Sequence, residues 1–274
     1  MTVIAHLSDP HFGTQVEAVV DALRSDIAAQ RPDIVVISGD LTQRARAPQF
    51  AATRAFADSL GAPVCLAVPG NHDIPLYDTL TRIANPRRLY KKFFGQRNHL
   101  WQQENLGLVC LDATSPLRHT RGKTQMRIAR RLLESARARL GDSGTLCVVE
   151  HQPLDVALEQ DRHEALINAQ ETARLFAEMR VDLVMSGHVH MPLLGTTAAA
   201  FPALPRHFIL SGAGTAVSYR TRSGAPNSYH LITLQDEAAK IALQAFHADS
   251  NAFVTARQSL FRRGGGGWTD DGGV

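Results

Sequence analysis

Short apolar runs alternate with stretches of helical periodicity along most of this chain of 274 residues. The runs at 2–8, 33–39 and 63–68 are almost continuously apolar, which is typical of strands buried on both faces. Between the last two, apolar residues recur at helical spacing and predict a helix over 47–60. This alternation favours an α/β fold with a parallel or mixed sheet covered by helices. The theme returns with strands at 106–112, 145–151 and 181–188 and helices at 126–140 and 163–180.

The pattern changes at three places, none of which looks like a linker. We expect one domain over 1–250, with residues 75–103 as a cap-like insertion because the regularity fades there. From 192 to 247 the helical period is absent, and β-type runs predict a second sheet or antiparallel edge strands. The remaining segment, 251–274, contains "GGGGWTDDGG" and is predicted to end in a disordered, glycine-rich tail.

Composition excludes several classes of protein. Hydrophobic residues make up 44% and charged residues 20%, as in ordinary globular proteins, and the net charge of +3 is too small to indicate nucleic-acid or membrane binding. Cys65, Cys110 and Cys147 each lie in an apolar run, which argues against a disulfide framework. Because we find no secretory pattern at the start and no apolar run of about 18 residues, we expect a cytoplasmic location.

Side chains that can bind metal directly follow five of the predicted strands. They are Asp9 and His11, then Asp40, then Asn71 with His72 and Asp73, then His151, then His188 with His190. Each alone has a structural explanation, because aspartate and asparagine are common in turns and helix caps and a histidine can be satisfied in a core. A single site at the carboxyl ends of the strands explains all five. We therefore expect these side chains to meet at one edge of the sheet.

The residue types point to a metal centre rather than to a covalent nucleophile. The candidate ligands are two aspartates, one asparagine and four histidines: Asp9, His11, Asp40, Asn71, His151, His188 and His190. A mixed oxygen and nitrogen set without thiolates suits Mn, Fe, Zn or Co. Seven ligands exceed the roughly four that one zinc ion takes, so they predict two divalent ions. Asp40 is the natural bridging carboxylate between them.

These residues fall into five ordered blocks. The blocks are Asp9-x-His11, Gly39-Asp40, Gly70-Asn71-His72-Asp73, His151 and Gly187-His188-x-His190. Together they resemble the calcineurin-like metallophosphoesterase superfamily, whose signature reads D-x-H, G-D, G-N-H-(D/E), H and G-H-x-H. The resemblance covers residues 9–190 and departs only at "EHQP", where many members have paired histidines. It implies a four-layer α-β-β-α sandwich in which two mixed sheets are flanked by helices.

The resemblance also implies which residues share a metal. It assigns one ion to Asp9, His11, Asp40 and His190, and the other to Asp40, Asn71, His151 and His188. "GDLTQ", "SGHVH" and the segment 212–232 look most like the bacterial class III cyclic-nucleotide and glycerophosphodiester phosphodiesterase branch. The implied function is a dinuclear metal-dependent phosphodiesterase that hydrolyses a small phosphodiester, a cyclic nucleotide or a glycerophosphodiester-like molecule, by attack of a metal-bridging hydroxide.

Two alternatives to this function stay open at this point. A UDP-2,3-diacylglucosamine-type diphosphate hydrolase, or another phosphohydrolase, would use the same metals. A metal-binding module with the same fold would be non-enzymatic, although such a module is expected to have lost ligands, and here no ligand position is missing.

Two residues of the block at 70–73 are catalytic candidates beyond the metal ligands. His72 is interpreted as the group that protonates the leaving alkoxide or stabilises a phosphoryl oxygen. Asp73 either holds His72 in its useful tautomer and raises its pKa, or only caps the turn. Gly70 is expected to let the backbone turn tightly.

Basic residues suggest how an anionic substrate is recognised. Arg118, Arg121 and Lys123 are the candidate substrate contacts, and six further lysines and arginines without an acid lie between Asp78 and Glu104. The alternative is a solvated helix face. We expect a small phosphodiester as the partner and no stable nucleic-acid complex. Contact with a membrane surface is not favoured, and a homodimer is left open.

Overall fold

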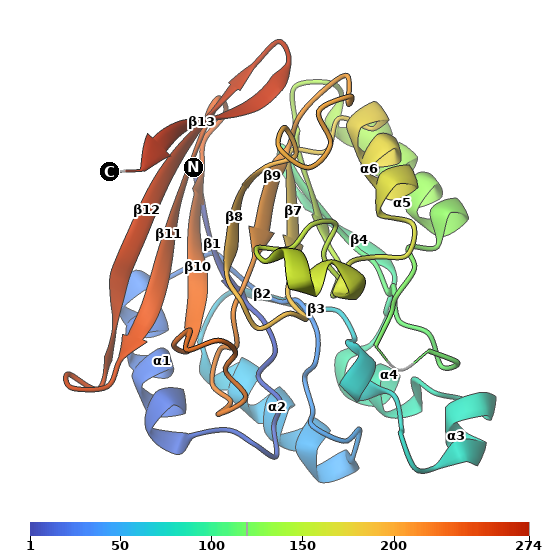
Figure 1. The fold of residues 1–274 in the computed structure, drawn as a ribbon, viewed down its shortest axis with the longest axis vertical. Coiled ribbons are helices and arrows are strands. Elements are labelled where there is room, and N and C mark those ends of the chain that lie inside the picture. The colour runs from blue at the N-terminus through green and yellow to red at the C-terminus, as the bar shows by residue number, and fades with distance from the viewer. Residues whose placement is uncertain (119, 274) are drawn as a thin grey trace.

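The computed structural model describes residues 1–118 and 120–273 (Figure 1). The strands are β1 (Thr2–Leu7), β2 (Ile34–Ile37), β3 (Val64–Ala67), β4 (His99–Gln103), β5 (Leu106–Cys110), β6 (Thr145–Val149), β7 (Leu183–Ser186), β8 (Leu193–Thr196), β9 (Ile209–Gly212), β10 (Ser228–Leu234), β11 (Ala238–His247), β12 (Ala252–Gly264) and β13 (Gly267–Gly273). The α-helices are α1 (Glu17–Gln30), α2 (Ala47–Ser59), α3 (Thr79–Ala84), α4 (Arg88–Phe94), α5 (Met126–Leu140) and α6 (Ala169–Glu178). Short 3₁₀ turns lie at Asn71–Asp73 and Glu159–Glu164.

Two mixed sheets carry the fold. The first has the order β13-β12-β11-β10-β1-β2-β3, in which β1, β2 and β3 are parallel and the strands from β10 to β13 are antiparallel. The second has the order β4-β5-β6-β7-β9-β8, with four parallel strands in its centre and antiparallel strands at both edges. The β-type runs predicted after residue 192 are therefore divided between the two sheets.

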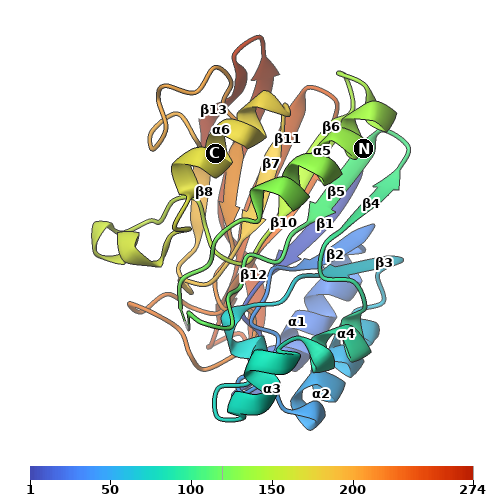
Figure 2. The same cartoon turned by 90° about the vertical axis from the view of Figure 1, so that its right-hand side faces the viewer.

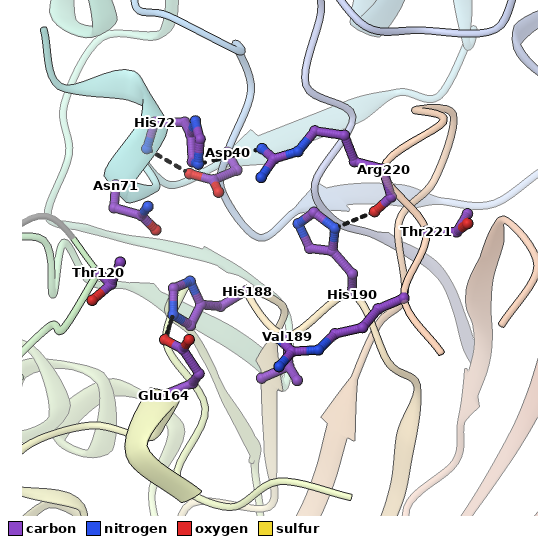
Figure 3. Close-up of a pocket in the computed structure, with 11 residues that line it drawn as sticks. Asp40, Asn71, His72, Thr120, Glu164, His188, Val189, His190, Arg220 and Thr221 are labelled. Atoms are coloured by element: carbon purple, nitrogen blue, oxygen red, sulfur yellow. Dashed lines mark hydrogen bonds and ion pairs between the residues drawn. The ribbon is translucent and has the colours of Figure 1, made fainter. Parts of the chain in front are cut away.

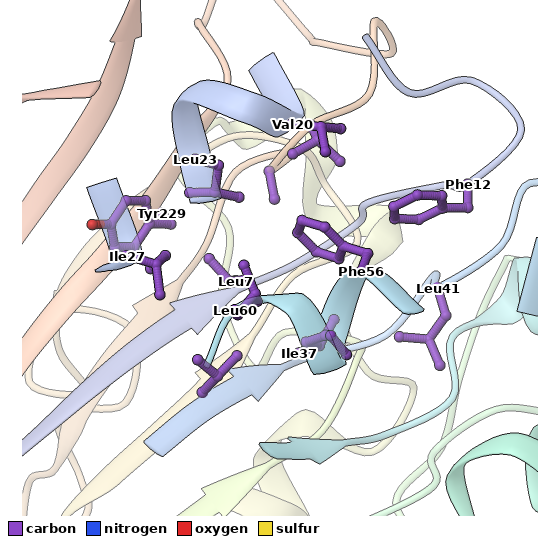
Figure 4. Close-up of a cluster of buried hydrophobic side chains, with 14 of the residues drawn as sticks. Leu7, Phe12, Val20, Leu23, Ile27, Ile37, Leu41, Phe56, Leu60 and Tyr229 are labelled. Atoms are coloured by element: carbon purple, nitrogen blue, oxygen red, sulfur yellow. The ribbon is translucent and has the colours of Figure 1, made fainter. Parts of the chain in front are cut away.

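The sheets pack face to face and helices cover their outer faces, as Figures 1 and 2 show. Strand β1 illustrates the pattern, because neighbouring side chains on a strand point to opposite faces. Ile4 belongs to the apolar cluster between the sheets, whereas Ala5 and Leu7 belong to the cluster under α1 and α2 (Figure 4). A third cluster lies under α5 and α6. The predicted four-layer α-β-β-α sandwich is confirmed.

Most predicted helices form close to their expected bounds, and one does not. The segments predicted as helices at 47–60 and 126–140 form α2 and α5. The helix expected over 163–180 is shorter, because α6 begins only at Ala169 and a separate 3₁₀ turn precedes it. Within the described residues no helix is long and apolar enough to cross a membrane.

The segment 75–103 is tied to the core at both ends. It contains α3, α4 and β4, and β4 pairs antiparallel with β5, so the end of the segment is part of the second sheet. On α4, the buried Tyr90 donates its hydroxyl hydrogen bond to the carbonyl oxygen of Ala67 at the end of β3 (2.8 Å). The segment thus lies beside the carboxyl ends of the strands of the first sheet.

The prediction that the segment 251–274 ends in a disordered, glycine-rich tail is wrong. Strands β12 and β13 form an antiparallel hairpin at the edge of the first sheet, with the run of glycines at its turn. Trp268 is almost fully buried, and its indole Nε1 donates a hydrogen bond to Asp182 Oδ1 (2.9 Å). The glycines look like low complexity in isolation, but the apolar Phe261 and Trp268 on either side of them supply the buried surface that orders the segment. Val274 lies outside the described residues.

Candidate metal centre

The predicted ligands all lie on loops that leave the carboxyl ends of strands. Strands β1, β2 and β3 of the first sheet lead to Asp9 and His11, to Asp40 and to Asn71, and strands β6 and β7 of the second lead to His151 and to His188 and His190. Because the two sheets pack face to face, these loops meet at one rim of the sandwich (Figure 3). The structure thus brings together all seven residues that the sequence predicted as ligands.

Four of these side chains form a first donor group. Ligand atoms of Asp9, His11, Asp40 and His190 all lie within 4.8 Å of one another. His190 Nε2 is 3.2 Å from Asp9 Oδ1, and His11 Nε2 is 3.0 Å from His190 Nε2. Two imidazole nitrogens that face each other at this distance, between two carboxylates, form a pocket of converging donors.

Asp40 also belongs to a second donor group. Its ligand atom lies within 4.8 Å of one from His151 and one from His188. His151 Nε2 is 3.4 Å from Asp40 Oδ2 and 3.2 Å from Asn71 Oδ1, so the asparagine oxygen faces the same space. The two groups therefore share one carboxylate, which is the arrangement that a bridging ligand requires.

The pKa values of these buried groups show strong mutual attraction. Burial alone would raise the pKa of Asp9 and Asp40, but the imidazoles that face them hold both pKa values well below the usual range. Burial alone would lower the pKa of His151, and Asp40 instead raises it to about 9; Asp9 likewise raises the pKa of His190. Protons on the raised-pKa imidazoles thus balance the charge of the two carboxylates. Metal cations bound between the same groups would balance it in the same way.

The donor set fits divalent metal ions. Carboxylate, amide and imidazole donors without a thiolate suit Mn, Fe, Zn or Co. The Nδ1 atom of His188 is buried and has no hydrogen-bond partner among the described residues, as expected of an atom reserved for a ligand. On the far side of a second imidazole, His151 Nδ1 is held 2.7 Å from the carbonyl oxygen of Ser38, which fixes the direction of its Nε2.

Backbone strain is concentrated in the same loops. Asp9, His11, Asp40, His188 and His190 all have positive φ angles, between 42° and 74°. Non-glycine residues adopt this conformation at an energetic cost, and such residues gather at functional sites. The fold therefore holds these five donors in positions that an ordinary turn would not adopt.

The block at 70–73 differs from expectation at Gly70 and matches one of the two roles considered for Asp73. Gly70 has an extended backbone, and a side chain there would collide with Asp40, so close packing rather than a tight turn requires the glycine. The carboxylate of Asp73 accepts hydrogen bonds from the backbone N–H groups of Gly70, Leu41 and Thr42 (2.9–3.0 Å). Of the two roles considered for Asp73, the structure supports that of a cap for the turn.

His72 stands at the mouth of the donor groups. Its backbone N–H donates to Asp40 Oδ1 (2.8 Å), and its ring packs edge-on against that of His11 with 4.8 Å between the centroids. The ring Nδ1 is 3.0 Å from the carbonyl oxygen of Gln43, so a proton on Nδ1 faces this oxygen and Nε2 is the atom turned toward the cavity. Gln43, and not Asp73, thus orients the ring.

An open cavity of about 290 Å³ lies directly over both donor groups. Its lining includes four of the candidate ligands, Asp40, Asn71, His188 and His190, together with His72, Thr120, Glu164, Arg220 and Arg222 (Figure 3). Arg220 Nη1 donates to Gln43 Oε1 (3.0 Å) and lies 3.3 Å from His72 Nε2, which places a guanidinium beside the centre.

The sequence predicted other cations for this place. Arg118 and Lys123 line a separate, larger cavity, and Arg121 is exposed and belongs to neither lining. Sequence reasoning missed Arg220 and Glu164, because neither stands next to a ligand in the chain. The one signal was the segment 212–232, which was noted for its resemblance and contains Arg220.

Known proteins resemble this chain in sequence and in structure. The calcineurin-like phosphoesterase family matches residues 2–192. A protein of Synechococcus sp. named "Probable cyclic nucleotide phosphodiesterase" is 25% identical over 221 residues, which are 75% of this chain and 81% of that protein. The glycerophosphodiester phosphodiesterase GpdQ of Enterobacter lignolyticus is 35% identical over 82 residues, which are 26% of this chain and 29% of GpdQ.

A solved structure shows the same architecture. A dimetal phosphatase from Danio rerio superposes with a TM-score of 0.60 at 12% identity, and the match covers 89% of this chain and 96% of that protein. At this identity the likeness shows the fold alone. The family match extends over most of the chain and includes every candidate ligand. The chain belongs to the calcineurin-like phosphoesterase family and is a metal-dependent phosphoester hydrolase.

Proposed function

We propose that this chain is a dinuclear metal phosphodiesterase that hydrolyses small phosphodiesters such as cyclic nucleotides or glycerophosphodiesters. The observation that carries the proposal is the sharing of Asp40 between two donor groups beneath an open cavity. Asp9, His11, Asp40 and His190 would hold one ion, and Asp40, Asn71, His151 and His188 the other. Divalent ions in these positions would polarise the phosphoryl oxygens and lower the pKa of water toward neutrality.

The side chains around the donor groups have tasks that do not depend on which metal is bound. Arg220 presents a guanidinium to the cavity, and this group can bind phosphoryl oxygens with two parallel hydrogen bonds. His72 faces the cavity with Nε2 while Gln43 holds its Nδ1. When protonated, His72 can therefore donate a proton from Nε2 to the alcohol oxygen that leaves as its P–O bond breaks.

Two features favour a diester over a monoester as the substrate. The Synechococcus sp. protein and GpdQ, which resemble this chain, are both named as phosphodiesterases. The cavity is open, so there is room for a second ester arm beyond the reacting phosphate. A diester carries one negative charge, and Arg220 supplies one positive charge in addition to the metals.

Hydrolysis of bis-p-nitrophenyl phosphate with added Mn²⁺ tests the proposal. The panel includes 3′,5′-cyclic AMP, 2′,3′-cyclic AMP and glycerophosphoethanolamine as diesters, and p-nitrophenyl phosphate as the monoester control. We expect hydrolysis of the diesters at a higher kcat/KM than that of the monoester, and loss of activity in Asp40→Asn. Hydrolysis of the monoester alone would contradict the proposal.

A further inference from the structure

A second, larger cavity opens beside the metal centre and has no part in holding the metals. Its volume is about 860 Å³, and it lies between the segment that follows β5 and the first turn of α5. Five cationic residues line it, and we call it the basic cleft: Arg87, Arg97, Arg118, Lys123 and Arg127. Neither the proposed metal ligands nor His72 reach it.

Two of the cations are fixed in place. The buried carboxylate of Asp112, just beyond β5, pairs with Arg87 and with Arg97, whose Nη1 lies 2.8 Å from Asp112 Oδ2. Arg87 also donates to the carbonyl oxygen of Thr114 (2.7 Å). Both arginines come from the segment 75–103, which therefore builds one wall of the basic cleft instead of remaining a solvated cap.

The other three cations are not neutralised. Arg118, Lys123 and Arg127 are exposed and make no ion pair with any residue that the structure describes. Only one acidic residue, Glu171, lies on the described lining. Together with Asp112 it leaves an excess of three positive charges in a concave site, and such a site attracts anions.

The backbone adds to the positive field. Residues 125–128, which form the start of α5, lie on the lining. The first turn of this 15-residue helix contains no acidic residue, and Gln125 provides no side-chain cap. The partial positive charge at a helix N-terminus favours an anion in addition to the cationic side chains around it.

Residues that are close together in the chain line both cavities. Thr120 lines the cavity over the metal centre, whereas Arg118 and Lys123 line the basic cleft. Along the chain their Cα atoms lie no more than about 8 Å and 11 Å from that of Thr120. Gly122 and Lys123 are held in place, because Lys123 N donates to the carbonyl oxygen of Ala113 (2.8 Å) and Ile167 N to that of Gly122 (3.0 Å).

We propose that the basic cleft binds a second phosphate group carried by the substrate of the metal centre. The proposal rests on the proposed phosphodiesterase function and narrows it: the preferred substrate is a diester with an additional phosphate monoester on its non-reacting arm. Arginine and lysine suit phosphate oxygens, and a dianion neutralises most of the excess charge. Arg118 and Lys123 are specificity-determining residues in this arrangement.

Two chromogenic diesters that differ by one phosphate test the proposal. The first is thymidine 5′-(p-nitrophenyl phosphate), and the second carries a further phosphate on the 3′ oxygen. In the holoenzyme we expect the second phosphate to raise kcat/KM about tenfold or more, as for hydrogen bonds to charged groups. In the double variant R118Q/K123Q the preference disappears, so that the ratio of the two kcat/KM values falls to about one.

Arg131→Gln is the matched control, because Arg131 is an exposed cation on α5 that does not line the basic cleft. This variant should retain the preference. The affinities for thymidine 3′,5′-bisphosphate and thymidine 5′-monophosphate, measured by calorimetry, give a second readout. We expect the wild type to bind the bisphosphate about tenfold more tightly than the monophosphate, and R118Q/K123Q to bind both equally.

The outcomes separate the two proposals. Equal kcat/KM for both diesters, or a preference that survives in R118Q/K123Q, overturns the basic cleft as a phosphate site while the phosphodiesterase function stands. Hydrolysis of neither diester overturns the phosphodiesterase function. In that case the binding constants of thymidine 3′,5′-bisphosphate and thymidine 5′-monophosphate test the basic cleft. Equal affinities for the two would overturn its role as a phosphate site.

Discussion

Glu164 Oε2 lies 3.0 Å from Nε2 of His188, and His188 Nδ1 points into the buried space of the second donor group (Figure 3). The carboxylate accepts a hydrogen bond from the Nε2–H group, so that in the neutral ring Nδ1 carries no proton and is able to bind a metal. The pKa of Glu164 is lowered, chiefly by this hydrogen bond, so the carboxylate is charged when it holds the ring. Glu164 is therefore a positioning residue that acts through His188.

Replacing Glu164 should weaken one metal site and leave the other intact. In Glu164→Gln the ring of His188 loses its charged partner, and we expect the affinity of the second ion to fall by about 10- to 100-fold. The affinity of the first ion stays unchanged, because among the described residues Glu164 pairs with His188 and His163 and with no proposed ligand of that ion. Calorimetric titration of the metal-free protein with Mn²⁺ measures both affinities.

Glu159→Gln is the matched control, since Glu159 lies on the same 3₁₀ turn with its side chain mostly exposed and paired to Arg162. If the affinity for the second ion is unchanged in Glu164→Gln, or falls equally in Glu159→Gln, Glu164 does not position His188.

Asp40 is expected to matter for both ions. Asp40→Asn keeps the shape of the side chain but removes the charge that both donor groups share. We expect the metal content of the purified protein to fall from about two ions to less than one, because ligand charge and number set the affinity. Activity on bis-p-nitrophenyl phosphate should fall by about 10³-fold. Elemental analysis beside the kinetics checks this, and retention of two ions would refute the bridging role.

Metal binding should release protons at neutral pH. Asp40 raises the pKa of His151 to about 9, so the metal-free protein carries a proton there at pH 7, and the pKa of His190 is also raised. A metal ion must displace these protons, and its apparent affinity therefore increases with pH until the pH exceeds the raised pKa values. For each displaced proton the increase is about tenfold per pH unit below that pKa.

Calorimetry in two buffers of different ionisation enthalpy measures the number of protons released. We expect at least about one proton at pH 7 when both ions bind, since His151 is protonated before binding. An enthalpy that is independent of the buffer would mean that the imidazoles are already neutral.

The sequence was sufficient to predict the candidate ligands that the structure brings together, because their signal is local. Each ligand stands within a few residues of a strand end, so the strand pattern and the residue type together place it at the rim. The partners of the ligands carry no such signal. Arg220 lies 30 residues beyond His190, and Glu164 stands in a 3₁₀ turn between β6 and α6, so only the folded chain brings either to the site.

Most of the fold was also predictable from the sequence. Apolar runs and helical periods identified most strands and helices, and the resemblance supplied the layers. The hairpin of β12 and β13 was missed because its turn is a run of glycines, and the burial of Trp268 depends on Asp182, more than 80 residues earlier in the chain. Long-range pairing of this kind leaves no local period.

The role of Asp73 can be tested separately from that of His72. Asp73→Ala leaves the N–H groups of Gly70, Leu41 and Thr42 without their acceptor in a buried site. We expect a loss of unfolding free energy of about 3 kcal/mol or more, measured by urea denaturation of the metal-free protein. Because Gln43 holds the His72 ring, the limbs of the pH–kcat profile should not move. A shifted limb in Asp73→Asn, which retains the shape of the side chain, would instead show that Asp73 tunes His72.

The C-terminal hairpin should be part of the stable core. Trp268 is 1% exposed, and its Nε1 donates to Asp182 Oδ1, which also pairs with Arg206 Nη2 (2.8 Å). Trp268→Ala removes a large buried ring and should lower the free energy of unfolding by about 3–5 kcal/mol. Trp268→Phe retains most of the ring but loses the hydrogen bond, and should cost less.

Deletion of residues 265–274 distinguishes an ordered hairpin from a dispensable tail. The truncated chain loses β13, which leaves the edge of β12 unpaired and removes Trp268 from the apolar cluster that contains Phe261, so we expect a loss of stability at least as large as in Trp268→Ala. Because the hairpin lies on the first sheet at the opposite edge from β3, the affinity for metal should stay the same in the fraction that remains folded. Chemical denaturation of the three proteins, with metal titration at a temperature where each is folded, measures both quantities. A truncated chain with the stability of the wild type would contradict the structural role of the hairpin.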